Sequence, residues 1–319
     1  MTPTTSTSTL FGEDVCAGLM KSGQKELPSK YLYDAVGSRL FEVITVLPEY
    51  GVTRAEDRIL ERHAREIAAR VPHGIAIAEL GSGTGTKTRR ILSALSRNHQ
   101  IRYFPIEISA TALAACEREV RDIAAVSVVG IEREYLDGLL EVAARRQERE
   151  HLLVLFLGST IGNFEPAAAL AFLTKIRSML VRGDFLLLGT DLMKPVPVLL
   201  DAYDDSLGVT AAFNLNLLAR INRELGGQFV LSQFEHVAKF NEEARSIEMR
   251  LRSKQAQTVA IGGSDVTVEF YAGETIWTES SHKYRLPQIS SMAAESGFTC
   301  PAQWIDDEWA FAENLWMAE

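Results

Sequence analysis

The feature that most limits how this chain can fold is the stretch IAIAELGSGTGTKTRRILSAL, at residues 75–95. A short run that is apolar except for one acid leads directly into a turn with three alternate glycines, and a helical pattern follows. A strand that enters a helix through such a turn is typical of a parallel βα unit, in which the turn holds a ligand against the backbone. Three ligand classes are compatible with the turn: a nucleoside triphosphate, a dinucleotide, or a smaller adenosine-containing cofactor.

The spacing of the turn argues against the first two classes. A triphosphate loop needs a lysine directly after a glycine, and Lys87 does not follow one. A dinucleotide fingerprint needs GxGxxG, whereas Gly81, Gly83 and Gly85 form GxGxG. By itself this pattern is weak, because a flexible turn between a strand and a helix explains it as well.

Charged residues near the turn favour the third class. Glu79 lies just before the turn, and Glu107 closes the next predicted strand, where an acid can accept hydrogen bonds from both ribose hydroxyls. Lys87, at the helix entrance, is available to a carboxylate of the cofactor. The combination resembles class I methyltransferases that use S-adenosylmethionine, so this cofactor is expected in place of NAD or ATP.

The hydrophobic pattern predicts two kinds of structure along the chain. From about residue 55 to 193, helices and buried strands alternate, as in a parallel sheet with covered faces. The predicted strands are 75–80, 102–109, 151–160 and 184–192, and the predicted helices are 56–71, 88–95, 111–126 and 166–180. Beyond Lys194 we expect a helical region at 198–226, then strands at 246–261 and 266–284 joined as an antiparallel hairpin through a turn at Gly262, Gly263 and Ser264.

Composition narrows the partners and the compartment. The 319 residues carry a net charge of −9 without basic runs, which argues against nucleic acid. The chain contains no apolar run of roughly 18 residues, and its first residues, MTPTTSTSTLFG, predict a loose leader and not a signal peptide. Three scattered cysteines and six histidines without ligand spacing favour a cytoplasmic protein with no metal site and no membrane association.

Several longer motifs occur in an order typical of one family. They are KYLYDAVGSRLFEVITVLPEYGVTRAE at 30–56, ELGSGTGTKT, FLGSTIGNFEP, LLGTDLMKP, AYDDSLGVTAAFNLN, FEHVAKFN, IEMRLR and TESSHKYR. The chain is identified on these motifs as a member of the L-histidine Nα-methyltransferases of ergothioneine biosynthesis.

The resemblance implies a fold and a reaction. The implied fold is α/β, with a Rossmann-like class I methyltransferase domain at 55–193 and 284–319. A second, smaller α+β substrate-binding domain is expected at 8–54 and 194–283, with the substrate between the two. The implied reaction transfers three methyl groups from S-adenosylmethionine to the α-amino group of L-histidine, which yields hercynine, and no obligate protein partner is expected.

The resemblance also assigns residues to roles. The expected cofactor contacts are Glu79, Gly81, Gly83, Lys87, Glu107, Ile131 and Glu132. The substrate amino group is expected near Tyr33, Gly158 and Thr160, its carboxylate at Asn163 and Tyr203, and its imidazole at Tyr50, Met249, Glu279 and Ser281. Glu279 and Ser281 are two residues apart in a predicted strand, so their side chains share one face and can bracket the two ring nitrogens.

Two departures from the family pattern concern the cofactor. Glu107 stands where relatives usually carry aspartate, and Ile131 and Glu132 stand where relatives carry an Asp-Phe pair that binds adenine. Either the alignment slips there or adenine is held differently. A third departure, in the EYGVT stretch after Tyr50, lies at the expected lip of the substrate pocket.

Two other functions remain open at this stage. One is an Nα-methyltransferase of the same fold that acts on another amino acid, such as tryptophan or tyrosine. The other is a cofactor-binding regulator without catalytic activity.

Overall fold

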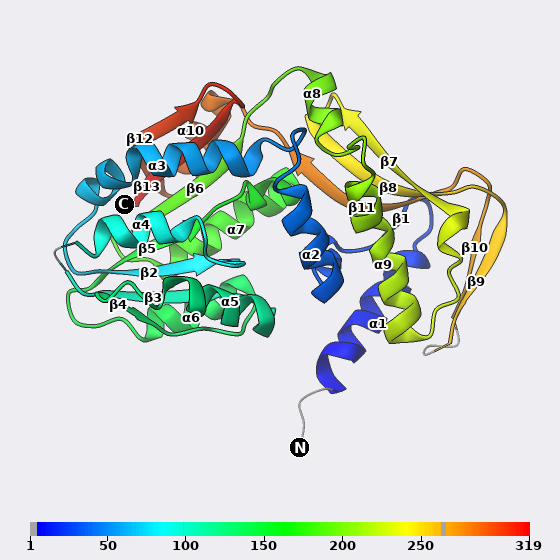
Figure 1. Ribbon diagram of the computed structural model, residues 1–319, viewed down its shortest axis with the longest axis horizontal. Coiled ribbons are helices and arrows are strands. Elements are labelled where there is room, and N and C mark those ends of the chain that lie inside the picture. Colours follow the sequence, from blue (N-terminus) through cyan, green and yellow to red (C-terminus); the bar gives the residue numbers. More distant parts are fainter. Residues whose placement is uncertain (1–4, 98, 263–265) are drawn as a thin grey trace. The chain divides into compact units, whose positions relative to one another are not determined.

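The computed structural model describes residues 5–97, 99–262 and 266–319. The chain divides into two compact units, each built from two segments (Figure 1). The first unit comprises the residues up to Gly51 together with Pro195–Ser281, and the second comprises Val52–Lys194 and His282–Glu319.

The second unit is organised around a seven-stranded sheet. Its strands are β2 (Ile75–Leu80), β3 (Ile101–Ile106), β4 (Val126–Val128), β5 (His151–Phe156), β6 (Phe185–Asp191), β12 (Phe298–Asp306) and β13 (Phe311–Ala318). Their order is β12-β13-β6-β5-β2-β3-β4, with β2 to β6 parallel and β13 antiparallel to both of its neighbours. The chain winds outward in both directions from β2, and in such sheets ligands bind at the carboxyl ends of the strands beside that switch point.

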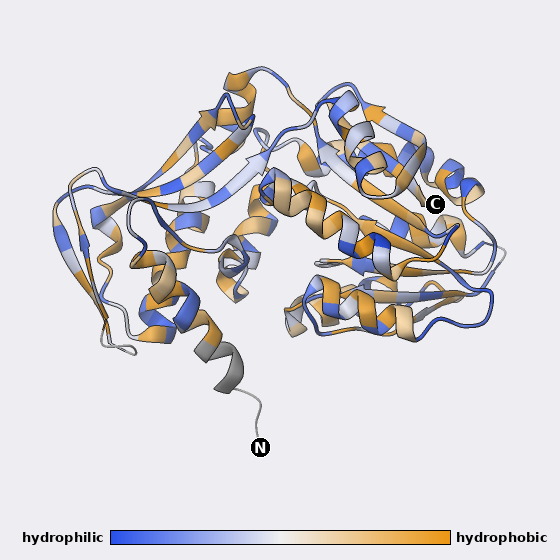
Figure 2. Cartoon of the chain, turned by 180° about the vertical axis from the view of Figure 1, so that it is seen from behind, coloured by the Kyte–Doolittle hydropathy of each residue, from blue (hydrophilic) through white to orange (hydrophobic). Residues whose placement is uncertain are grey.

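Helices cover both faces of this sheet (Figure 1). Helices α6 (Tyr135–Ala144), α7 (Pro166–Met179) and α10 (Leu286–Glu295) share one hydrophobic core with the strands. Helices α3 (Val52–Arg70), α4 (Thr88–Leu95) and α5 (Ala110–Val120) lie on the other face. The strands are largely hydrophobic along their length (Figure 2), as burial on both faces requires. The expected Rossmann-like class I fold is thereby confirmed.

The first unit is α+β. Its helical elements are α1 (Thr5–Leu19), η1 (Ser29–Leu32), α2 (Ala35–Ile44), α8 (Val196–Asp201), α9 (Val209–Leu225) and η3 (Leu231–Gln233). Its strands are β1 (Lys25–Glu26), β7 (Phe234–Asn241), β8 (Ser246–Ser253), β9 (Gln257–Ile261), β10 (Val266–Phe270) and β11 (Thr275–His282), whose last residue belongs to the second unit. Four of them form a sheet in the order β1-β11-β8-β7, and helix α2 packs on α9.

The prediction of a loose N-terminal segment is wrong from Thr5 onward, where helix α1 begins. Phe11, Val15 and Leu19 are buried at intervals of four residues, which place them on one helix face. The Phe11 ring lies 4.6 Å from that of Tyr31. This packing outweighs the weak helix propensity of the Thr and Ser residues around it.

Other predicted elements differ in extent from the structure. Helix α5 ends at Val120, and Val126, the last residue of the predicted helix, begins the edge strand β4. The region 198–226 is two helices, because the chain takes a positive φ of 72° at Gly208 before α9. The region 246–261 is two strands, β8 and β9, and the region 266–284 is also two strands, β10 and β11.

The predicted hairpin pairing is confirmed for β9 and β10, which are antiparallel. Gly263 and Ser264 of its turn lie outside the described residues. Among the described helices, none has the length and hydropathy needed to cross a membrane.

Candidate active site

The glycine turn after β2 is shaped by its backbone. Gly81, Gly83 and Gly85 have φ angles of 75°, 53° and 75°, in the left-handed region that favours glycine. A Cβ atom on Gly85 would lie 2.6 Å from the sulfur of Cys116, so a side chain there would clash. A Cβ on Gly83 would meet nothing within 4 Å. The space in front of Gly83 is therefore open, and the turn fits a cofactor that lies against its backbone.

Glu107 lies at the same edge of the sheet as the turn. Its Oε2 accepts a hydrogen bond from the Gly83 N–H at 3.2 Å. Its Oε1 accepts from the backbone N–H groups of Ile108 and Ser109 at 2.9 and 3.2 Å. Three backbone donors thus fix this carboxylate beside the turn, at the carboxyl ends of β2 and β3.

Glu79 points inward from β2. It is 3% exposed, and its oxygens accept hydrogen bonds from the hydroxyls of Thr88 and Tyr103. Burial raises the pKa of Glu79 to about 7. These contacts tie β2, β3 and α4 together beneath the turn, and a direct cofactor contact by Glu79 stays a prediction.

Lys87 links the turn to the loop after β5. Its ammonium group pairs with the carboxylate of Glu56 on α3, and the other Glu56 oxygen accepts a hydrogen bond from the Gly158 N–H. The Lys87 side chain is 27% exposed and remains accessible, whereas that of Glu56 is fully buried. Sequence analysis missed Glu56, because on an amphipathic helix it looks like one more surface acid.

The loop after β5 holds three of the predicted site residues. Gly158 and Ser159 both take positive φ angles, 73° and 58°, and such a conformation is strained for serine. The Ser159 Oγ accepts the backbone N–H of Asp191 at 2.8 Å, which holds this bend. Thr160 begins the short helix η2 (Thr160–Asn163), and Asn163 ends it. Gly158, Thr160 and Asn163 therefore all lie at the carboxyl end of β5, the strand next to β2.

The segment after β4 contains an aromatic residue that sequence analysis missed. Ile131 is buried, and its backbone bonds to Pro105 and Glu107, while Glu132 is exposed. Tyr135, the first residue of α6, packs against the glycine turn instead. A Cβ on Gly81 would lie 3.2 Å from the Tyr135 hydroxyl. Helix α6 was not predicted, so nothing pointed to a tyrosine at its start.

In the first unit, aromatic rings connect three predicted site residues. Ring centroids are 5.4 Å apart for Tyr33 and Phe41, 6.2 Å for Phe41 and Tyr50, and 6.3 Å for Tyr50 and Tyr203. All three contacts are edge-to-face, the geometry that aromatic quadrupoles favour. Tyr33, Tyr50 and Tyr203 thus belong to one continuous row.

The same row reaches the sheet of the first unit. The Tyr203 hydroxyl donates a hydrogen bond to the Oγ of Ser281 at 2.7 Å. Ser281 and Glu279 lie on β11, and Met249 lies on the neighbouring strand β8. All four side chains are buried, so polar groups and the apolar Met249 side chain lie together beneath the surface of this unit.

The backbone of Tyr203 is held by a half-buried histidine. His236 lies 2.8 Å from the Tyr203 carbonyl through its Nε2 and 2.9 Å from the Asn214 side-chain amide through its Nδ1. A neutral ring that donates from Nε2 and accepts at Nδ1 satisfies both contacts. Burial lowers the pKa of His236, which favours this neutral form.

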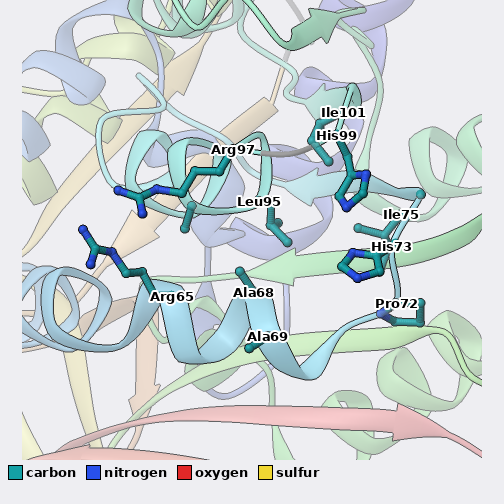
Figure 3. A pocket seen from close by; sticks show the side chains of 12 residues that line it. Arg65, Ala68, Ala69, Pro72, His73, Ile75, Leu95, Arg97, His99 and Ile101 are labelled. Atoms are coloured by element: carbon teal, nitrogen blue, oxygen red, sulfur yellow. The ribbon is translucent and has the colours of Figure 1, made fainter.

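A cavity of about 290 Å³ lies elsewhere in the second unit (Figure 3). Arg65, His73, Arg97 and His99 contribute its polar side chains, together with the first residues of β2 and β3. It is therefore at the amino ends of the strands, away from the edge at which parallel sheets bind ligands. Within the described ranges, no cluster of His, Cys, Asp and Glu suits a metal ion.

Comparison with known proteins indicates the same family as the sequence motifs. The profile of a family described as histidine-specific methyltransferase, SAM-dependent, matches residues 11–318. The histidine N-alpha-methyltransferase of Mycolicibacterium smegmatis is 44% identical over 95% of this chain and 93% of that protein. Ergothioneine biosynthesis protein 1 of Neurospora crassa is 35% identical over 65% of this chain and 24% of that protein. The L-tryptophan methyltransferase of Psilocybe serbica is 28% identical over 92% and 89% of the two chains.

The family profile spans nearly the whole chain, and the fold and the glycine turn are those that the motifs predicted. The chain belongs to the family of histidine-specific methyltransferases that depend on S-adenosylmethionine.

Proposed function

We propose that the protein transfers three methyl groups, one at a time, from S-adenosylmethionine to the α-amino nitrogen of L-histidine. The product is hercynine, and the reaction is the first step of ergothioneine biosynthesis. The 44% identity to a histidine N-alpha-methyltransferase over 95% of the chain carries this proposal. The first unit is then the substrate-binding domain, and the second is the methyltransferase domain.

The cofactor supplies an electrophilic methyl group when bound, and residues of the second unit would hold it. We assign the ribose hydroxyls to Glu107, whose carboxylate is fixed beside Gly83. The open backbone at Gly83 lets the cofactor approach closely, the backbone of Gly81 lies beside it, and Lys87 binds the cofactor carboxylate. Glu79 supports the turn from below.

The adenine side of the cofactor falls to the segment after β4. Glu132 offers an exposed carboxylate there, and the buried Ile131 before it holds the segment in place through its backbone bonds to Pro105 and Glu107. Tyr135 adds a phenol at Gly81, which compensates for the Asp-Phe pair that this chain lacks.

The amino group of histidine must be neutral to attack. An α-amino group in water is mostly protonated at neutral pH, so the site has to favour the unprotonated form. A positive charge on the methyl donor disfavours a second cation nearby, which lowers the pKa of the amine. In each step the nitrogen–carbon bond forms as the sulfur–carbon bond breaks, and water takes up the amine proton before the next attack.

We assign the placement of this nitrogen to Tyr33, Gly158 and Thr160. Gly158 has no side chain, which leaves room for a nitrogen that grows by one methyl group in each cycle. Thr160 is held in place because its Oγ1 donates to the Leu157 carbonyl at 2.9 Å. A fixed loop favours catalysis because the reacting atoms must be about 3 Å apart and in line.

The remaining assignments concern the rest of the substrate. Asn163 and Tyr203 hold the carboxylate, and Tyr50, Met249, Glu279 and Ser281 surround the imidazole. One ring nitrogen is assigned to Glu279, to which it donates a hydrogen bond, and the other is assigned to the Ser281 hydroxyl.

A second candidate is methylation of another amino acid, because a tryptophan methyltransferase matches 92% of this chain. A cofactor-binding regulator without activity is the third. Incubation of the protein with S-adenosylmethionine and each of histidine, tryptophan and tyrosine, with mass detection of one, two and three added methyl groups, separates all three. Trimethylated histidine supports the proposal, methylated tryptophan or tyrosine supports the second candidate, and no product supports the third.

We also propose that the enzyme is cytoplasmic and works without a protein partner. Within the described residues, Cys16, Cys116 and Cys300 form no disulfide, which suits a reducing cytoplasm. The reaction needs only two small molecules, so we expect the purified chain to be active without a protein partner.

A further inference from the structure

Glu56 occupies a central position in the methyltransferase unit. Its side chain is fully buried, yet both of its oxygens are used. One binds the Lys87 ammonium, and the other accepts the Gly158 N–H. A single carboxylate therefore joins the cofactor turn to the loop that we assign to the substrate amine.

A second buried carboxyl group lies against Glu56. Glu313 on β13 is fully buried, and neither of its oxygens accepts a hydrogen bond from a donor in the described part of the chain. A Cβ atom on Gly189 would lie 2.7 Å from Oε1 of Glu56 and 3.2 Å from Oε1 of Glu313, so the two carboxyl groups converge above that glycine.

When two neighbouring carboxyl groups share a buried site, the pKa of one of them is strongly raised. Burial, and then the charge of Glu56, raises the pKa of Glu313 well above its usual range. Glu313 therefore keeps its proton and is placed to donate it to Glu56, whose other partner is Lys87.

The charges around this group come from four elements. Glu56 lies on α3, Glu79 on β2, Lys87 at the start of α4 and Glu313 on β13. Strand β6 contributes Gly189 to this contact, and the loop after β5 contributes the Gly158 N–H. With Glu313 protonated, Lys87 and Glu56 balance each other.

We propose that Glu56, Lys87 and Glu313 act as one cofactor-positioning unit. Glu56 fixes Lys87 and the Gly158 loop together, and the proton on Glu313 keeps a second negative charge away from the place where the cofactor carboxylate binds. Glu56 and Glu313 are positioning residues, since they act through Lys87 and Gly158. The inference rests on the proposed assignment of Lys87 to the cofactor carboxylate.

A linkage between cofactor affinity and pH follows. When Glu313 loses its proton, two carboxylates compete with the cofactor carboxylate for one lysine. Affinity must then fall as the pH rises through the pKa of Glu313. In Glu313→Gln the amide N–H can still donate to Glu56, and no proton can be lost.

The first test is calorimetric titration of the full chain with S-adenosylhomocysteine, from neutral to alkaline pH. At neutral pH, we expect the Kd values of wild type and Glu313→Gln for S-adenosylhomocysteine to lie within about threefold of each other. Such a difference is smaller than the loss of one hydrogen bond would cause. At alkaline pH, wild type should bind this ligand roughly tenfold more weakly than the variant. This is the effect expected if ligand binding changes the pKa of Glu313 by one unit. The ligand's own ammonium titrates equally in both proteins and cancels in this ratio. A ratio that does not change with pH overturns the role of Glu313.

The second test separates positioning from simple stability. Lys87→Met alone leaves Glu56 as a buried unpaired charge, so it should lower the melting temperature and weaken binding. The double variant Glu56→Gln/Lys87→Met removes both charges and should recover most of the melting temperature. Its affinity for S-adenosylhomocysteine should stay at least roughly tenfold below wild type, since no cation remains for the carboxylate. Recovery of both properties would mean that the pair only stabilises the fold.

Asp57→Asn is the matched control. Asp57 is the next residue on α3, and it pairs with Arg90 at 2.7 Å in a partly exposed ion pair. We expect its affinity and melting temperature to stay close to wild type, and a loss as large as that of Lys87→Met would contradict the specific role of the buried unit. All of these titrations omit the amino-acid substrate. Absence of histidine methylation by wild type therefore overturns the proposed function without affecting them.

Discussion

The Tyr203 hydroxyl donates a hydrogen bond to Ser281 at 2.7 Å, between two side chains that are both buried in the first unit. The proposal places Tyr203 at the carboxylate of the substrate and Ser281 at its ring. The bond couples these two ends, so a change at either residue is felt by the other.

Tyr203→Phe should therefore change selectivity as well as affinity. The substitution removes the hydroxyl that donates to Ser281, at a cost of about 1–3 kcal/mol. We expect kcat/KM for histidine to fall by about 10- to 100-fold, and by less for tryptophan, whose ring does not use Ser281. Steady-state kinetics with both amino acids measures this, and equal losses for the two would argue against the coupling.

Asn163→Ala should behave differently. Asn163 is assigned to the carboxylate alone, a group that every amino acid carries. KM should rise by about tenfold for histidine and tryptophan alike, the loss of one hydrogen bond to a charged group. A change in the ratio of the two kcat/KM values would show that Asn163 faces the ring.

Tyr135→Phe tests the residue that packs on the glycine turn. If its hydroxyl contacts the cofactor, the Kd for S-adenosylhomocysteine should rise by about three- to tenfold, with the melting temperature unchanged. Tyr271→Phe is the control, because Tyr271 is 75% exposed and lies in the first unit. Equal affinities for the two variants would remove Tyr135 from the site.

Glu79→Gln tests the raised pKa of the buried carboxyl group beneath the turn. The quantity to measure is the free energy of unfolding as a function of pH. The usual pKa of glutamate, 4.5, applies to the unfolded chain, and burial raises the folded value to about 7. Between these values the folded protein binds a proton that the unfolded chain lacks, so the free energy of unfolding falls as the pH rises. The slope is up to about 1.4 kcal/mol per pH unit.

In the variant this contribution is absent, so the pH dependence over the same window should be shallower. Urea unfolding at several pH values measures both slopes. Equal slopes would mean that Glu79 is ionised throughout.

Local pattern was enough to predict the central strands. The predicted strand 75–80 coincides with β2, because a short apolar run before a glycine turn has few alternatives. The prediction of Glu107 beside the turn also holds, since parallel strands bring their carboxyl ends to one edge.

The features that the sequence did not predict depend on contacts between segments far apart in the chain. Glu313 reaches Glu56 because β13 pairs with β6 in the antiparallel direction. The local sequence pattern does not predict this pairing. Likewise, α1 is helical although its sequence is rich in Thr and Ser, because Phe11 and Val15 are buried by tertiary packing. The bond between Tyr203 and Ser281 joins α8's end to β11 in the same way.

The measurement that tests the central claim most directly is a competition assay with histidine and tryptophan present together. A pocket whose buried polar groups need partners can reject a ligand that leaves them unpaired by about 10⁴-fold, whereas apolar matching gives roughly 10- to 200-fold. Wild type should convert histidine to its trimethylated form with little tryptophan product. Glu279→Ala should lower kcat/KM for histidine and narrow or reverse the preference, because tryptophan can use the space beside Met249. Methylation of tryptophan in preference to histidine by wild type would contradict the account.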